Sequence, residues 1–201
     1  MTNAVLLTSL TDRLALASPR AIRLAAVVFL TALTAAAAQV SVPLPFTPVP
    51  LTLQPMVVLL GGAALGSRLG SASQILYLLA GIAGLPVFAA TPALPQGVAR
   101  LVGPTGGFLL SYPLAAFVAG WLAERGFDRR YVTSVIAMAA GLTIVFASGV
   151  SMMAAQLTPV LGAAAWTAAL QQAFYPFVLI DAVKLLAGAT VLPGIWKVVG
   201  R

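Results

Sequence analysis

The chain is dominated by long apolar runs, and its charged residues lie almost entirely in the segments between them. Of its 201 residues, 61% are hydrophobic and 7% are charged, and the mean hydropathy is +1.04. This composition is typical of a protein that crosses a membrane several times. We therefore predict one all-α integral membrane domain over residues 1–201. It is a bundle of six transmembrane helices, at about 24–40, 52–66, 70–88, 107–123, 131–155 and 172–198.

The charges predict how this bundle is oriented. The formal net charge is +7, but the cations form no single basic stripe, so we exclude nucleic acid as a partner. Six spans place both termini on one side, together with Arg13, Arg20, Arg23, Arg68, Arg125, Arg129, Arg130, Lys197 and Arg201. The opposite side carries Arg100 alone. By the positive-inside rule both termini are cytoplasmic, in a multi-pass protein of the bacterial inner membrane.

The first apolar run has a second interpretation. Arginines followed by ten apolar residues and a small-residue stretch at 36–39 also fit a cleaved signal peptide. We favour a retained helix because it produces the charge distribution above. Ala21 and Ala25 then give this helix a small-residue face for close helix packing.

The residues needed for most enzyme chemistry are missing. The sequence contains no Cys and no His, which removes thiolate nucleophiles, imidazole ligands and Ser-His pairs. It contains four acidic residues, and only Asp181 lies within a clear apolar run. A metal-dependent membrane enzyme would need several carboxylates around one site. We therefore predict a protein that is not an enzyme and has no metal site and no cofactor.

Asp181 and Lys184 lie near the middle of the last apolar run, residues 174–193. A charge at that depth costs ~2.5 kcal/mol or more, so such residues face a protein interior or an aqueous cavity. Three residues apart on a helix, they share a face. We predict a substrate-binding pair roughly 9 and 14 Å below the outer boundary, reached from outside. The alternative is a structural pair that holds the last helix to its neighbours.

Two proline-rich segments interrupt the helical pattern. Residues 42–55 hold five prolines and no charge, which predicts a rigid extended loop rather than a binding site. Residues 86–106 are irregular, and backbone of this kind is tolerated at a membrane where it lines a cavity. At its end, Gly106 and Gly107 begin a helix and can present N–H groups to an anionic ligand. With Arg100 above the mouth, we predict an external pocket for a polar or anionic solute.

Four motifs together resemble the BioY family, the biotin-specific substrate-binding (S) components of energy-coupling-factor (ECF) vitamin transporters. They are Pro-Val-Pro-Leu-Thr-Leu-Gln at 48–54, Gly-Leu-Pro-Val-Phe-Ala at 84–89, Gly-Pro-Thr-Gly-Gly at 103–107, and Asp181-x-x-Lys184. The resemblance implies a six-helix fold that binds biotin outside. It also implies coupling to a transmembrane subunit driven by two ATPase subunits, with Ala21 and Ala25 on the coupling face. The sequence has no phosphate-binding loop of its own.

The chemistry of biotin fits these residues. A buried carboxylate such as Asp181 can accept the ureido N–H groups, and Lys184 can donate to the ureido oxygen. The valerate carboxylate would then point outward to Arg100, with Gly106 and Gly107 assisting. Aromatic side chains can flank the rings, and the candidates are Phe88, Phe174 and Tyr175. Two other functions remain: binding of another small vitamin, and a structural membrane subunit with a buried Asp–Lys pair.

Overall fold

The computed structural model describes residues 18–90 and 95–199, which are mostly helical. The helices are α2 (Pro19–Gln39), α3 (Gln54–Leu65), α4 (Ser67–Ile82), α5 (Val98–Val102), α6 (Gly106–Ala123), α7 (Tyr131–Leu161), α8 (Ala165–Ala173), α9 (Tyr175–Gly188) and α10 (Val191–Val199). A short antiparallel hairpin of β1 (Ser41–Val42) and β2 (Leu51–Thr52) joins α2 to α3. Arg13 and Arg201, which entered the orientation argument, lie outside the described residues.

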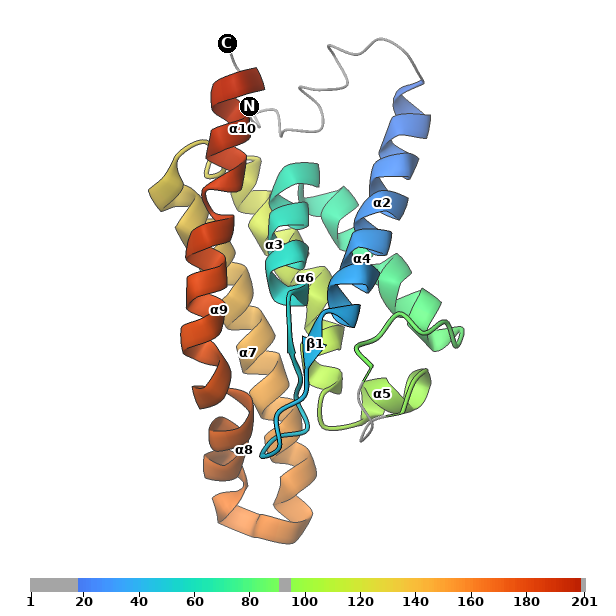
Figure 1. The fold of residues 1–201 in the computed structure, drawn as a ribbon, viewed down its shortest axis with the longest axis vertical. Coiled ribbons are helices and arrows are strands. Elements are labelled where there is room, and N and C mark those ends of the chain that lie inside the picture. Colours follow the sequence, from blue (N-terminus) through green and yellow to red (C-terminus); the bar gives the residue numbers. More distant parts are fainter. Residues whose placement is uncertain (1–17, 91–94, 200–201) are drawn as a thin grey trace.

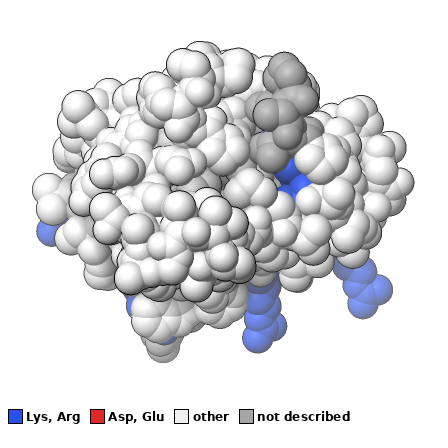
Figure 2. Space-filling view, turned by 90° about the horizontal axis from the view of Figure 1, so that it is seen from below, with Lys and Arg blue, Asp and Glu red and all other residues white. Residues whose placement is uncertain are grey.

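α2, α7, α9 and α10 run roughly along the long axis of the molecule (Figure 1). α2 begins and α10 ends at the same end, which we call the termini end. The tip of the hairpin, α5 and α8 lie toward the opposite end, which we call the loop end. Across residues 40–55, 83–105 and 156–175 the only charged side chain is Arg100. Figure 2 looks onto the loop end: the middle of this face is white apart from blue in a small hollow, and other blue side chains project at the left and lower margins of the view.

Three helical stretches of the described chain are long and apolar enough to cross a membrane: Arg20–Gln39, Gly106–Ala123 and Tyr131–Val198. The last of these doubles back on itself, since α7 runs away from the termini end and α8–α10 return to it (Figure 1). α3 is a shorter apolar helix. The molecule is therefore an all-helical membrane protein, and the six-span count and orientation stay predictions.

The last expected helix, 172–198, is broken twice in the structure, and each break has a proline as its cause. Pro176 has no N–H to give to the carbonyl of Gln172, four residues earlier, and the chain bends at Phe174 between α8 and α9. The Thr47 hydroxyl donates to that carbonyl instead, at 2.7 Å. Pro193 likewise has no N–H to donate to the Ala189 carbonyl, and α9 ends at Gly188, the residue before Ala189.

Other boundaries also differ from those expected. The helix expected at 70–88 ends at Ile82, and the chain then turns at a left-handed Gly84 with φ 90°. The helix expected at 131–155 continues to Leu161. A proline at 159 does not end it, and a left-handed Gly162 at φ 53° does.

Small residues let α6 lie at the centre of the bundle. A Cβ on Gly62 of α3 would lie 2.5 Å from the Ala116 carbonyl oxygen of α6. A Cβ on Gly120 of α6 would lie 2.5 Å from the backbone nitrogen of Ser67, at the start of α4. Backbones approach this closely in membrane bundles only where side chains are absent. The close packing fixes α6 as a rigid wall for what lies on its other face.

Candidate functional site

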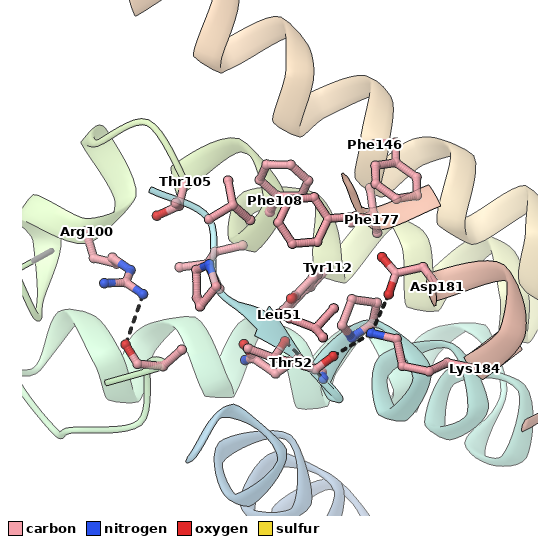
Figure 3. A pocket seen from close by; sticks show the side chains of 17 residues that line it. Leu51, Thr52, Arg100, Thr105, Phe108, Tyr112, Phe146, Phe177, Asp181 and Lys184 are labelled. Carbon is pink, nitrogen blue, oxygen red and sulfur yellow. Dashed lines mark hydrogen bonds and ion pairs between the residues drawn. The ribbon is translucent and has the colours of Figure 1, made fainter. Parts of the chain in front are cut away.

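A pocket lies between the β1–β2 hairpin, α6, α7 and α9 (Figure 3). Its cavity volume is about 50 Å³. The walls are mostly apolar, with aromatic rings from three helices: Phe108 and Tyr112 from α6, Phe146 from α7 and Phe177 from α9. The charged side chains among its described lining residues enter at two places, which lie at opposite sides of the pocket in Figure 3.

The first polar group is the predicted pair on α9. The Lys184 ammonium forms an ion pair with the Asp181 carboxylate, as the i, i+3 spacing predicts. Lys184 also donates to the backbone carbonyl of Thr52, at 2.6 Å, on strand β2. Asp181 is 7% exposed. Because an ammonium has three hydrogens, two bonds to the protein leave Lys184 one donor for a ligand.

The second polar group contains Arg100. This side chain is 2% exposed, and its Nη2 donates to the Ala89 carbonyl at 2.9 Å. α5 carries it into the pocket wall, so it is not a stray surface cation. Thr105 lies beside it in Figure 3, and its buried hydroxyl has no hydrogen-bond partner among the described residues. A guanidinium and a hydroxyl in one apolar wall suit a carboxylate ligand.

A buried chain of hydrogen bonds supports the wall between these two groups. The Gln54 amide nitrogen donates to the Tyr77 hydroxyl at 2.7 Å, and that hydroxyl donates to the Val87 carbonyl at 3.1 Å. Gln54 lines the pocket and is 3% exposed. With its amide nitrogen held by Tyr77, the orientation of the Gln54 side chain is fixed.

The sequence pattern of the BioY family matches residues 8–201 of this chain. The chain belongs to the BioY family. It is 37% identical to the "Biotin transporter BioY" of Thermotoga maritima over 161 residues, which is 80% of this chain and 88% of that one. It is 42% identical to the "Probable biotin transporter BioY" of Pyrococcus horikoshii over 123 residues, 61% of this chain and 68% of that one. The family resemblance found in the motifs is thus confirmed.

The fold of this BioY-family chain is also that of a solved structure. It matches the crystal structure of "the S-component for biotin from an ECF-type ABC transporter" with a TM-score of 0.75. The match covers 89% of this chain and 92% of that one, at 22% sequence identity. At this identity the match establishes a shared fold and nothing further about the site.

None of the three predicted aromatic residues, Phe88, Phe174 and Tyr175, lines the pocket of this BioY-family chain. Phe88 is fully buried behind it, packed edge-on against Tyr77 with ring centroids 5.5 Å apart. Tyr175 is 60% exposed, next to Phe174 at the start of α9. The direction of each side chain depends on how helices pack, which the sequence pattern did not contain. The predicted coupling residues Ala21 and Ala25 lie on an exposed face of α2.

The glycines at the start of α6 have a packing role in the structure. The Gly106 N–H already donates to the Gly103 carbonyl, at 2.9 Å, so it is not available to a ligand as predicted. A Cβ on Gly106 would lie 1.8 Å from the Leu101 carbonyl oxygen, and one on Gly107 would lie 2.4 Å from that of Ser148. Neither glycine lines the pocket, whereas Thr105 does.

Several pocket residues were missed by the sequence argument. Residues 42–55 were expected to be a rigid loop and not a site, but Thr52 and Gln54 lie on the pocket wall. The polar side chains of Thr52 and Gln54, in a proline-rich segment without charges, could have indicated a binding role. Phe177 precedes Asp181 by four residues, so helical spacing alone could have found it. Tyr112 and Phe146 had no such signal.

Proposed function

We propose that this BioY-family chain binds biotin at the outer face of a bacterial cell membrane and delivers it as the substrate-binding component of an ECF-type transporter. The observation that carries the proposal is one aromatic pocket with an acid–base pair at one side and a buried arginine at the other. The names of its relatives as biotin transporters support it. The chain is thus a transport protein and not an enzyme.

The Asp181–Lys184 pair suits the ureido ring of biotin. The carboxylate accepts from ureido N–H groups, and the third ammonium hydrogen of Lys184 donates to the ureido oxygen. The other two hydrogens stay with Asp181 and the Thr52 carbonyl. Because the ureido ring carries N–H donors and a carbonyl acceptor side by side, it needs an acceptor such as Asp181 and a donor such as Lys184 in the same place.

The aromatic walls suit the apolar part of the ligand. Phe108, Tyr112, Phe146 and Phe177 surround the space between the two polar groups (Figure 3). The bicyclic ring and its alkyl chain would fill this space, with the valerate carboxylate on Arg100 and the Thr105 hydroxyl. A cavity of about 50 Å³ is far below the 300–1,000 Å³ of ordinary ligand clefts, so the pocket must widen when biotin binds.

The orientation follows from charge. The loop end, which has Arg100 as its charged residue, is placed outside, and the arginine-rich termini end is placed in the cytoplasm. The energy then comes from a transmembrane subunit and two ATPase subunits, with Ala21 and Ala25 of α2 on the coupling face. The exposure of both alanines leaves that face open to a partner helix.

Equilibrium binding of labelled biotin to the purified full chain tests the proposal. We expect saturable binding of one biotin per chain, displaced by unlabelled biotin and not by thiamine or riboflavin. Displacement by another vitamin would replace biotin as the substrate. Absence of binding to any vitamin, with a folded protein, would favour the structural subunit.

A further inference from the structure

A second cavity lies between α7, α8 and α9, on the side of Phe146 that faces away from the substrate pocket, and we call it the α7–α9 groove. Its volume is about 770 Å³, within the 300–1,000 Å³ of clefts that hold small ligands. Its lining contains no charged residue, and Thr143 and Ser151 are its only hydroxyls. The Thr143 hydroxyl is bonded to the Ala139 carbonyl of its own helix, at 2.9 Å. A polar ligand would therefore find few partners there.

The groove follows the part of the chain that crosses the membrane. Along α7 its lining runs from Val135 to Ser151, a stretch of seventeen residues and about 24 Å of helix. The hydrocarbon core of a bilayer is about 30 Å thick, so the groove extends through most of one apolar layer. Trp166 lies at its loop-end margin on α8 and is 56% exposed. Such an indole is common where lipid chains meet the interface.

We propose that the α7–α9 groove binds one acyl chain of a membrane phospholipid. The bilayer surrounds these helices and supplies that chain at the right depth. A transmembrane helix is a poorer occupant: a segment 24 Å long and about 10 Å wide fills about 1,900 Å³, more than twice the groove. A single narrow, flexible, apolar chain matches its size, length and lining.

The bound chain would pack against the back of the substrate pocket. Phe146 lines both the groove and the pocket. Leu142 and Leu185 line both the groove and a cavity of about 10 Å³ beside the Asp181–Lys184 pair. One layer of side chains thus separates lipid from the buried charges. The proposal concerns this outer surface and does not depend on which solute the pocket takes.

Intact-mass spectrometry of the full chain released from detergent micelles tests the proposal. We expect the wild-type protein to retain one phospholipid per chain after delipidating washes. Ala147→Phe and Ser151→Phe place a ring in the groove from two exposed positions, and each should lower the retained fraction at least tenfold. Ala32→Phe makes the same change on the exposed face of α2 and should retain the lipid as the wild type does.

Three outcomes would overturn the proposal. The wild-type chain could retain no lipid, or the groove variants could retain it as well as Ala32→Phe does. A dimer mass that Ala147→Phe abolishes would show that a second copy covers the groove. Biotin binding, measured on the same samples, reports on the substrate pocket separately, so failure of one proposal is distinguishable from failure of the other.

Discussion

The Thr47 hydroxyl donates a hydrogen bond to the Gln172 carbonyl, 2.7 Å away and 125 residues further along the chain. That carbonyl is the one that Pro176 leaves without its helical partner. Thr47 also accepts from the Val49 N–H, at 3.1 Å. The Thr47 side chain therefore stabilises the turn of the hairpin and gives a hydrogen bond to the carbonyl left without a helical partner between α8 and α9.

Replacing Thr47 by Val should destabilise the protein. The change keeps the shape but leaves the Gln172 carbonyl without a partner, which costs about 1–3 kcal/mol and lowers Tm by roughly 2–10 °C. Thr143→Val is the matched control, because that hydroxyl bonds within its own exposed helical turn. Thermal unfolding in detergent measures both. Equal Tm values for the two variants would remove the proposed role of Thr47.

Arg100→Ala should discriminate between biotin and its carboxyl amide. Loss of a charge-assisted bond to the valerate is worth about 1.5–3 kcal/mol, so biotin should bind about 10- to 150-fold more weakly. The amide carries no charge and should lose much less. Arg68→Ala, an exposed arginine at the start of α4, is the control. If both ligands weaken equally, Lys184 becomes the partner of the tail.

Asp181→Asn separates a binding pair from a structural pair. Lys184 keeps its bond to the Thr52 carbonyl in this variant, so we expect a normal membrane yield and a large loss of biotin binding. A structural pair would instead leave an uncompensated charge, at about 3–5 kcal/mol, and lower the yield. Yield and labelled-biotin binding are measured on the same preparation. Poor yield with retained binding would support the structural interpretation. Lys184→Ala should weaken biotin and its amide about equally.

The buried Asp128, at the termini end, should make the thermal stability of the protein depend on pH. Burial raises the pKa of Asp128, and the hydrogen bond from Trp196, at 2.6 Å, opposes the rise. Because the pKa of Asp128 in the folded state lies above its ordinary value of 3.8, the stability that this group contributes is fully present below pH 3.8. That contribution is lost as the pH rises through the folded-state pKa. The Tm advantage of Asp128→Asn over the wild type should therefore be larger at pH 7 than at pH 4. A difference that does not change with pH would contradict this.

Cysteine labelling can test the predicted orientation directly, since the natural chain has no Cys. Phe46→Cys lies in the exposed hairpin loop, and Arg130→Cys lies on the exposed turn before α7. A membrane-impermeant maleimide should label intact cells at position 46 only. Position 130 should react after the membrane is opened. The reverse pattern would place the termini outside.

The sequence determined the features that depend on neighbouring residues. Apolar runs and turn residues located α3 and α6 to within two residues at each end, and i, i+3 spacing placed Asp181 and Lys184 on one face. The motifs also identified the family. These results are local because a helix is set by bonds between residues four apart and a lipid-facing run is set by composition.

Only the tertiary structure decided which residues far apart in the sequence contact one another. It buried Arg100 in a wall, brought Thr52 of the hairpin to Lys184, and turned Phe88 and Tyr175 away from the pocket. The physical reason is that a pocket is defined by the relative rotation and contact of helices far apart in sequence. In an almost wholly apolar chain, no polar–apolar periodicity marks which face of each helix turns inward.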